Sequence, residues 1–333
     1  MKPKILLTGK TGQIGSALFR LLPRLGEVTA PDHRELDLLD PMSIRRVVRE
    51  VRPQVIVNTA AFTAVDAAET DEARARAINA EAPCLFAEEA KKLGAAIVHF
   101  STDYVFDGLK RVPYDETDAP NPLNAYGRTK FEGEQTIRGT DVNHLIFRTA
   151  WVYSTRSRNF LLTILRLATE QDELRVVCDQ FGAPTCATDI AAATAEILTR
   201  IYGPCSKACS ISEVSGTYHM TAAGETTWYA FARTILEEAA HVSRGASWFA
   251  SATQGNSLIA RRVIPISADL YRSRTVRPTY SVLSNSLMLQ TFGIELGDWR
   301  CQLLRCLSGE QLEHEFEIPQ KSSTSVELPP RLL

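Results

Sequence analysis

Two residues four positions apart, Tyr126 and Lys130, could carry proton-transfer chemistry. On a helix this spacing places both side chains on one face, so the lysine ammonium would lie beside the phenol. A nearby positive charge favours the phenolate and predicts a Tyr126 pKa below the usual value of about 10. Such a tyrosine could exchange a proton near neutrality. Many Tyr-x-x-x-Lys pairs are only surface neighbours on a helix, so the interpretation depends on the surrounding elements.

A hydroxyl pair lies close to this tyrosine in the sequence. Ser101 and Thr102 follow the apolar run 95–100, which predicts a buried strand. A hydroxyl group at the end of that strand could hold the same substrate oxygen as Tyr126.

A glycine-rich segment near the N-terminus predicts a dinucleotide site. Gly9, Gly12 and Gly15 follow a predicted strand over residues 4–7 and precede a helical pattern over residues 16–25. One glycine permits a tight turn, one lets the backbone approach a pyrophosphate, and one allows close packing of helix and strand. The start of the helix offers free N–H groups to phosphate oxygens.

The second predicted strand covers residues 27–30, and the residues that follow it indicate which nicotinamide cofactor could bind. An acidic residue here commonly binds the ribose hydroxyls, and an arginine can hold a 2′-phosphate. Asp32 and Arg34 are both present, so the cofactor is predicted to be NADPH or NADH without a choice between them. Asp37 faces the adenine or is a solvated loop acid.

Strands and helices alternate through the first half of the chain. The third strand, 54–58, ends in small residues that would let a ligand approach, and a helix over 71–93 is expected to be interrupted at Pro83. Asp40 is expected to cap the helix that begins at Pro41. This alternation predicts an α/β fold with a Rossmann-type, doubly wound parallel sheet.

Composition excludes several classes of protein. The 333 residues carry a formal net charge of −2, which argues against nucleic-acid or membrane-surface partners. No apolar run approaches the roughly 20 residues of a membrane span, and no signal-peptide pattern is present. The seven scattered cysteines fit reduced thiols in a cytoplasmic protein better than a zinc site, and no metal site is predicted.

Several longer sequence segments resemble one known protein family more closely than the short motifs do. With the glycines, Thr102, Tyr126 and Lys130, the chain resembles the dTDP-4-dehydrorhamnose reductase family of the extended short-chain dehydrogenases/reductases. The likeness covers nearly all of residues 1–305 and is carried by these segments: 58–66 (NTAAFTAVD), 121–127 (NPLNAYG), 147–153 (FRTAWVY), 179–185 (DQFGAPT), 226–228 (TTW) and 277–278 (RP).

The resemblance implies NAD(P)H-dependent reduction of dTDP-4-dehydro-L-rhamnose to dTDP-L-rhamnose. It implies that Tyr126 donates a proton to the C4 oxygen, that Lys130 holds the nicotinamide ribose and lowers the Tyr126 pKa, and that Thr102 binds the substrate oxygen. Asp103, Trp151 and Arg277 are further candidates for substrate contact, with core packing equally open for Trp151. The candidate cofactor-binding residues are Gly9, Thr11, Gly12, Gln13, Ile14, Gly15, Asp32, Arg34, Asp37, Leu38, Ala60, Ala61, Thr63, Tyr126 and Lys130.

The same resemblance predicts the domain organisation. Residues 1–150 are expected to form the nucleotide-binding domain, and residues 151–309 a smaller C-terminal substrate-binding lobe that also returns elements to the sheet. Residues 203–216 are interpreted as a surface insertion, and the polar residues 310–333 as a disordered tail.

Some family members use a glutamate two residues after the third glycine, with Mg²⁺, at a dimer interface. Here that position is Ala17, which argues against a Mg²⁺-bridged dimer of that kind and leaves at most a loose Mg²⁺ requirement; a monomer or a homodimer is expected. Two alternatives also stay open: another nucleotide-sugar epimerase, dehydratase or reductase of the superfamily, and a non-catalytic NADP-binding regulatory subunit.

Overall fold

The computed structural model describes residues 2–203, 209–242, 246–271 and 275–309. The predicted tail, 310–333, lies outside the described residues, and so does part of the predicted insertion.

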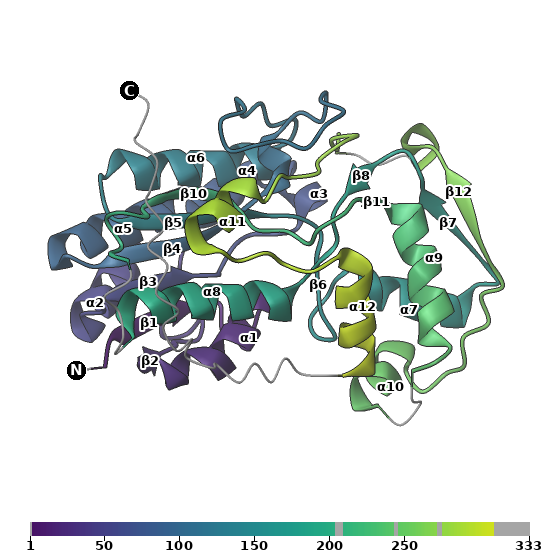
Figure 1. The fold of residues 1–333 in the computed structure, drawn as a ribbon, viewed down its shortest axis with the longest axis horizontal. Coiled ribbons are helices and arrows are strands. Elements are labelled where there is room, and N and C mark those ends of the chain that lie inside the picture. Colours follow the sequence, from purple (N-terminus) through teal and green to yellow (C-terminus); the bar gives the residue numbers. More distant parts are fainter. Residues whose placement is uncertain (1, 204–208, 243–245, 272–274, 310–333) are drawn as a thin grey trace, which may run out of the picture.

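A six-stranded parallel sheet forms the centre of the molecule (Figure 1). The strand order is β10-β5-β4-β3-β1-β2, and every neighbouring pair is parallel. The order reverses direction between β1 and β3, which is the place where open α/β sheets bind ligands at the carboxyl ends of their strands. The strands are β1 (Lys4–Thr8), β2 (Glu27–Thr29), β3 (Val55–Asn58), β4 (Ala96–Thr102), β5 (His144–Thr149) and β10 (Gly216–His219).

Helices cover both faces of this sheet because the central strands bury apolar side chains on both sides. Leu6, Ile56, Ile97 and Ile146 pack with α2 (Pro41–Val51), α5 (Ala82–Leu93) and α6 (Ala125–Gly139) on one face. The alternate positions, such as Ile5 and Leu7, pack with α1 (Gln13–Leu21), α8 (Ala187–Tyr202) and α11 (Ser286–Phe292) on the other. The predicted doubly wound α/β fold is confirmed.

The predicted helix over 71–93 is divided, but Pro83 does not interrupt it. After α3 (Val65–Ala68) and α4 (Glu72–Arg76), a π-helical turn (Ala77–Glu81) precedes α5. Pro83 lies in the first turn of α5, where its missing N–H removes no helical hydrogen bond. The expected N-cap of α2 is confirmed, since the Asp40 side chain accepts a hydrogen bond from the Met42 N–H at 2.9 Å.

The C-terminal half builds a lobe with an apolar core of its own, at the right of Figure 1. Three elements of this half do not belong to the lobe. β10 joins the six-stranded sheet, and α8 and α11 pack against it. The lobe and its connections contain β6 (Val152–Tyr153), α7 (Phe160–Glu170), β7 (Glu173–Val177), β8 (Phe181–Gly182), β9 (Thr185–Cys186), β11 (Thr226–Thr227), α9 (Trp228–Ala239), α10 (Ser247–Thr253), β12 (Arg262–Ile266) and α12 (Trp299–Ser308).

Three short 3-10 segments complete the described chain: η1 (Leu22–Arg24), η3 (Asp103–Val105) and η4 (Ala268–Tyr271). Within the described ranges, none of the helices is both long enough and apolar enough to cross a membrane. The boundary at residue 150 stays a prediction.

Candidate active site

The glycine-rich turn between β1 and α1 has the geometry of a phosphate cradle. Gly9 has a φ of +71°, and a Cβ there would lie 2.8 Å from the Ala60 nitrogen. A Cβ on Gly15 would lie 2.1 Å from the Gly9 carbonyl oxygen, so no larger residue fits. Gly12 is the N-cap of α1 and supplies no side chain to its first N–H groups. The turn therefore fits the pyrophosphate of a dinucleotide.

The Gln13 side chain ties this turn to the segment after β6. Its Nε2 donates to the Val152 carbonyl oxygen at 3.1 Å, and its Oε1 accepts from the Ser154 hydroxyl at 2.8 Å. Thr11 and Ile14 flank it in the same turn. The turn is thus held against the segment after β6 by the Gln13 side chain.

The residues predicted to hold the adenosine ribose lie beyond β2. The Asp32 carboxylate accepts hydrogen bonds from the backbone N–H groups of Arg34 (2.8 Å) and Glu35 (3.2 Å), and these bonds lower the Asp32 pKa. The Arg34 residue is exposed. Asp37 is also exposed and accepts from the Leu39 N–H at 2.9 Å, while Leu38 packs against the core between β1 and α2.

The segment after β3 lies beside the glycine-rich turn. The Thr59 hydroxyl donates to the Thr8 carbonyl oxygen at 2.6 Å, and the Ala60 N–H donates to the Thr8 hydroxyl at 3.3 Å. Ala61 is partly buried and Thr63 is exposed. The ends of β1 and β3 thus meet at the reversal point of the sheet.

Two elements bring Thr102, Tyr126 and Lys130 together. Thr102 is the last residue of β4 and is 5 % exposed, and Tyr126 lies in the first turn of α6. Asn124 starts this helix, since its side chain accepts from the Gly127 N–H at 2.8 Å. The Thr102 hydroxyl hydrogen-bonds the Tyr126 phenol, which lowers the Tyr126 pKa by less than burial raises it.

The predicted low pKa of Tyr126 is wrong. Burial raises the Tyr126 pKa to about 12 and lowers the Lys130 pKa to about 8. The Lys130 ammonium donates to the Phe100 carbonyl oxygen at 2.5 Å and lies 3.1 Å from His99 Nε2. The loss of hydration on burial therefore outweighs the attraction that the i, i+4 spacing predicted.

Asp103 is a buried carboxylate beside the candidate catalytic groups. Its Oδ1 accepts from the Thr102 hydroxyl at 3.0 Å, and its Oδ2 accepts from the Ser281 hydroxyl at 2.6 Å. Burial raises the Asp103 pKa to about 7. The adjacent Tyr104 ring lies edge-on to Tyr126, with 5.9 Å between the ring centroids.

Trp151 joins the two parts of the molecule. Its φ of +47° is rare for a residue with a side chain, and its ring stacks on Trp228 at 3.4 Å between ring centroids. Gly182 lies so close that a Cβ there would be 2.4 Å from the Trp151 ring. The other substrate candidate, Arg277, donates to an oxygen of Asp66 at 3.1 Å.

Several residues of this region were not predicted from the sequence. His99 is the one polar residue within the apolar run 96–100, a pattern that could have drawn attention to it. Ser281, Asp66 and Trp228 come from distant parts of the chain, and the sequence gives no sign of their contacts.

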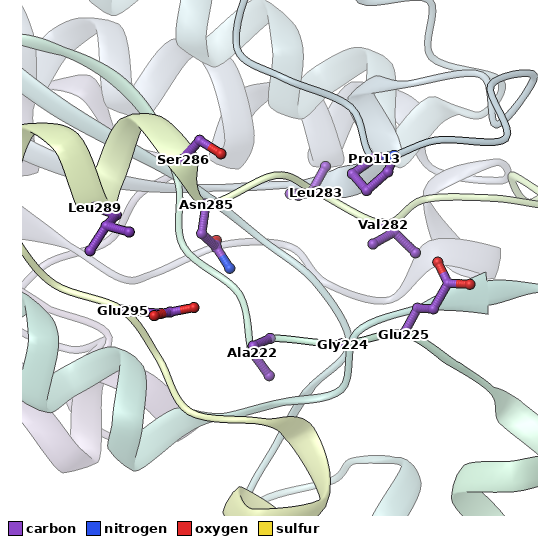
Figure 2. A pocket seen from close by; sticks show the side chains of 11 residues that line it. Pro113, Ala222, Gly224, Glu225, Val282, Leu283, Asn285, Ser286, Leu289 and Glu295 are labelled. Carbon is purple, nitrogen blue, oxygen red and sulfur yellow. The ribbon is translucent and has the colours of Figure 1, made fainter.

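A separate pocket of about 310 Å³ lies near α11 (Figure 2). Pro113, Gly224, Val282, Asn285 and Glu295 are among the residues that line it. It contains none of the predicted site residues, which lie at the sheet edge instead. Among the residues that the structure describes, no group of three or more His, Cys, Asp or Glu side chains could hold a metal ion.

Comparisons with known proteins bear on the family of the whole chain. The family described as "RmlD substrate binding domain" matches residues 2–312. The dTDP-4-dehydrorhamnose reductase of Burkholderia thailandensis is 45 % identical over 91 % of this chain and 98 % of its own length.

Two solved structures share the whole fold. The dTDP-4-dehydrorhamnose reductase of Bacillus anthracis, in complex with NADP, is 31 % identical, with a TM-score of 0.79 over 92 % of this chain and 99 % of its own. The Clostridium acetobutylicum dTDP-4-dehydrorhamnose reductase ortholog is 33 % identical, with a TM-score of 0.80 over 93 % and 100 % of the two chains. With its glycine-rich turn and the Thr102, Tyr126 and Lys130 cluster, this chain belongs to the dTDP-4-dehydrorhamnose reductase family.

Proposed function

We propose that this protein reduces the C4 ketone of dTDP-4-dehydro-L-rhamnose to the alcohol of dTDP-L-rhamnose, with NADPH or NADH as reductant. The observation that carries this proposal is the meeting of Thr102, Tyr126 and Lys130 at the sheet edge that also bears the glycine-rich turn. The names of the relatives specify the sugar nucleotide.

Tyr126 serves as the general acid. When bound, the reduced nicotinamide supplies a hydride to C4. The carbonyl oxygen then gains negative charge and takes the Tyr126 proton, so the ketone becomes an alcohol. Because the Tyr126 pKa lies at about 12, the phenol is protonated throughout the physiological range. Thr102 lies beside the phenol and lowers its pKa, so both hydroxyl groups are available to the same substrate oxygen.

Lys130 contributes its positive charge and, by the family resemblance, holds the nicotinamide ribose. Its pKa of about 8 keeps most of the side chain charged at neutral pH. The charge stabilises the negative oxygen that forms on Tyr126 once its proton has left. Reduction should therefore weaken as pH rises through about 8, because Lys130 and not Tyr126 loses its proton there.

The substrate is expected in contact with both parts of the molecule. Trp151, beside the sheet, is stacked on Trp228 of the lobe, and an indole face suits the apolar side of a sugar ring. Arg277 suits the pyrophosphate, provided that it exchanges its Asp66 partner for a phosphate oxygen. Asp103 orients Thr102. These roles, the cytoplasmic location and the monomeric or homodimeric state are predictions.

Tyr126→Phe tests this function. The substitution keeps the ring and removes the proton donor, so kcat should fall about 10²- to 10⁴-fold while NADPH binding, followed by fluorescence, changes little. Tyr104→Phe, which alters a neighbouring half-buried phenol, is the matched control and should retain far more activity. Near wild-type turnover of Tyr126→Phe would refute the mechanism.

A coupled assay tests the substrate. The product made from dTDP-glucose by the preceding dehydratase and epimerase should be reduced with consumption of NADPH. A nucleotide-sugar epimerase would change the sugar without net NADPH consumption, and a regulatory NADP-binding subunit would bind the cofactor without turnover.

A further inference from the structure

A row of polar side chains crosses the sheet beneath the candidate active site. Thr8, Asn58 and His99 are paired in register across β1, β3 and β4. Each follows by two residues a side chain of the core that faces α6, namely Leu6, Ile56 and Ile97, so all three point to the α6 face. The three residues are at most 1 % exposed.

Hydrogen bonds connect the row to the catalytic helix. The Thr8 hydroxyl donates to Asn58 Oδ1 at 2.6 Å, and Asn58 Nδ2 lies 3.1 Å from His99 Nδ1. His99 Nε2 lies 3.1 Å from the Lys130 ammonium. Both ring nitrogens of His99 therefore have a polar partner in a region without solvent, where unpaired polar atoms are costly.

The charge states in this row follow from burial. Burial and the neighbouring Lys130 charge hold the His99 pKa well below its usual value, so the imidazole is neutral. A neutral imidazole has one nitrogen free to accept, and an ammonium has only donors. For the ammonium to donate to His99 Nε2, the ring proton must lie on Nδ1, so the Asn58 amide must then present its oxygen rather than its nitrogen to the ring.

We propose that His99 is a positioning residue for the reduction: its neutral ring accepts a hydrogen bond from Lys130, keeps that side chain charged, and orients it toward Tyr126. The Lys130 ammonium has three N–H groups. Phe100 and His99 receive two of them, which leaves one for the cleft, where Tyr126 lies one helical turn away. This inference rests on the proposed function of Lys130.

The Asn58 amide lets the row serve both charge states of Lys130. With Lys130 charged, the ring proton lies on Nδ1, and the amide oxygen turned toward His99 can receive it. With Lys130 neutral, the amide nitrogen donates to Nδ1, and the proton on Nε2 bonds to the amine. A rotation of the amide by a half turn exchanges the two arrangements, since its two ends have similar shapes.

The other ionisable side chains around Lys130 are the same in wild type and in every His99 variant. Glu134, on α6, raises the Lys130 pKa, and Arg148 of β5 pairs with Glu134 at 2.7 Å. Tyr126 and Asp103 lie on the cleft side. Variants of His99 leave all four in place, so a change in the titration of Lys130 can be assigned to the His99 contact.

The direct test follows the ¹³Cε resonance of Lys130 against pH in the cofactor-free protein, assigned by its loss in Lys130→Met. His99→Leu removes the acceptor, and the midpoint should fall by about one pH unit or more. His99→Gln offers a carbonyl oxygen instead and should restore most of the midpoint. His144→Gln, a matched change on β5, should not alter it. An unchanged midpoint in His99→Leu, or equal shifts in His99→Leu and His99→Gln, would overturn the proposal.

Activity provides the second readout. In His99→Leu the alkaline fall of kcat should move to lower pH by the same amount as the Lys130 midpoint, and much of the lost rate should return at about pH 6, where Lys130 is charged again. A loss of kcat by the same factor at every pH would indicate a structural role only and would overturn the proposal. Failure of the wild-type protein to reduce the sugar nucleotide would refute the proposed function, while the NMR result would stand.

If His99→Leu fails to fold, NMR measurements on the wild-type protein still test the proposal. Ring ¹⁵N shifts should show a neutral His99 between about pH 6 and about pH 9. The Nε2 shift should change with the same midpoint as Lys130. A Nε2 signal that stays constant while Lys130 titrates would overturn the proposal.

Discussion

At the scale of single residues, burial controls the chemistry of the site more than charge pairing does. Tyr126, Asp103 and Lys130 all have pKa values displaced toward their neutral forms. Each shift has the sign expected when a group leaves water. Hydrogen bonds reduce the shift for Tyr126 and Asp103, and the Glu134 charge reduces it for Lys130. The proton donor therefore stays protonated while the neighbouring lysine is the group that titrates near working pH.

Arg34 decides the preference between the two cofactors if its exposed guanidinium meets a 2′-phosphate. Arg34→Ala should then raise KM for NADPH about tenfold while KM for NADH changes little, because only NADPH offers the phosphate. Arg24→Ala, an exposed arginine in η1, is the control and should leave both values unchanged. Equal effects of Arg34→Ala on both cofactors would show that Arg34 is only a surface charge.

Asp103 should make stability depend on pH. Its folded-state pKa of about 7 lies above the ordinary value of 3.8, so the folded protein holds this proton more tightly than the unfolded chain. Ionisation therefore costs stability as pH rises from about 4 to about 7, by up to about 4 kcal/mol. Asp103→Asn removes this dependence.

Urea unfolding of wild type and Asp103→Asn at about pH 5 and about pH 8 measures the effect. The unfolding free energy of Asp103→Asn minus that of wild type should be larger at the higher pH than at the lower one. The same difference in unfolding free energy at both pH values would contradict the assignment, since other groups titrate alike in the two proteins.

At the scale of elements, the close contact between β1 and α1 makes the cofactor turn. Gly15→Ala should abolish NADPH binding and lower the melting temperature, because the new Cβ would meet the Gly9 carbonyl at 2.1 Å and backbone atoms must move. Gly139→Ala is the control. No atom lies within 4 Å of a Cβ there, and alanine should add up to about 1 kcal/mol of stability at this helical position. Normal NADPH binding by Gly15→Ala would refute this account of the turn.

At the scale of the whole molecule, the stack of Trp151 on Trp228 joins the sheet domain to the lobe. Trp228→Ala should free Trp151 and raise KM for the sugar nucleotide about tenfold, with NADPH binding nearly unchanged, because the cofactor turn lies elsewhere. Trp248→Ala, in α10 of the same lobe, is the control: it should cost stability without changing KM. Equal effects of the two substitutions on KM would show that the stack serves packing alone.

The sequence alone was sufficient for the parts of this protein that depend on local order. Gly9, Gly12 and Gly15 lie within one turn, and Tyr126 and Lys130 within one helical turn, so their spacing specifies their geometry wherever they occur. Alternating apolar segments likewise predicted the parallel sheet, because strand and helix periods are local properties.

The contacts that these side chains make with distant parts of the chain could be known only from the tertiary structure. His99 reaches Lys130 from another element, Ser281 reaches Asp103 from 178 residues away, and Trp228 reaches Trp151 from the lobe. The pKa of Tyr126 was mispredicted for the same reason. Its value depends on how much water the folded chain excludes from the phenol, and that exclusion is a property of the packed molecule rather than of any spacing along the chain.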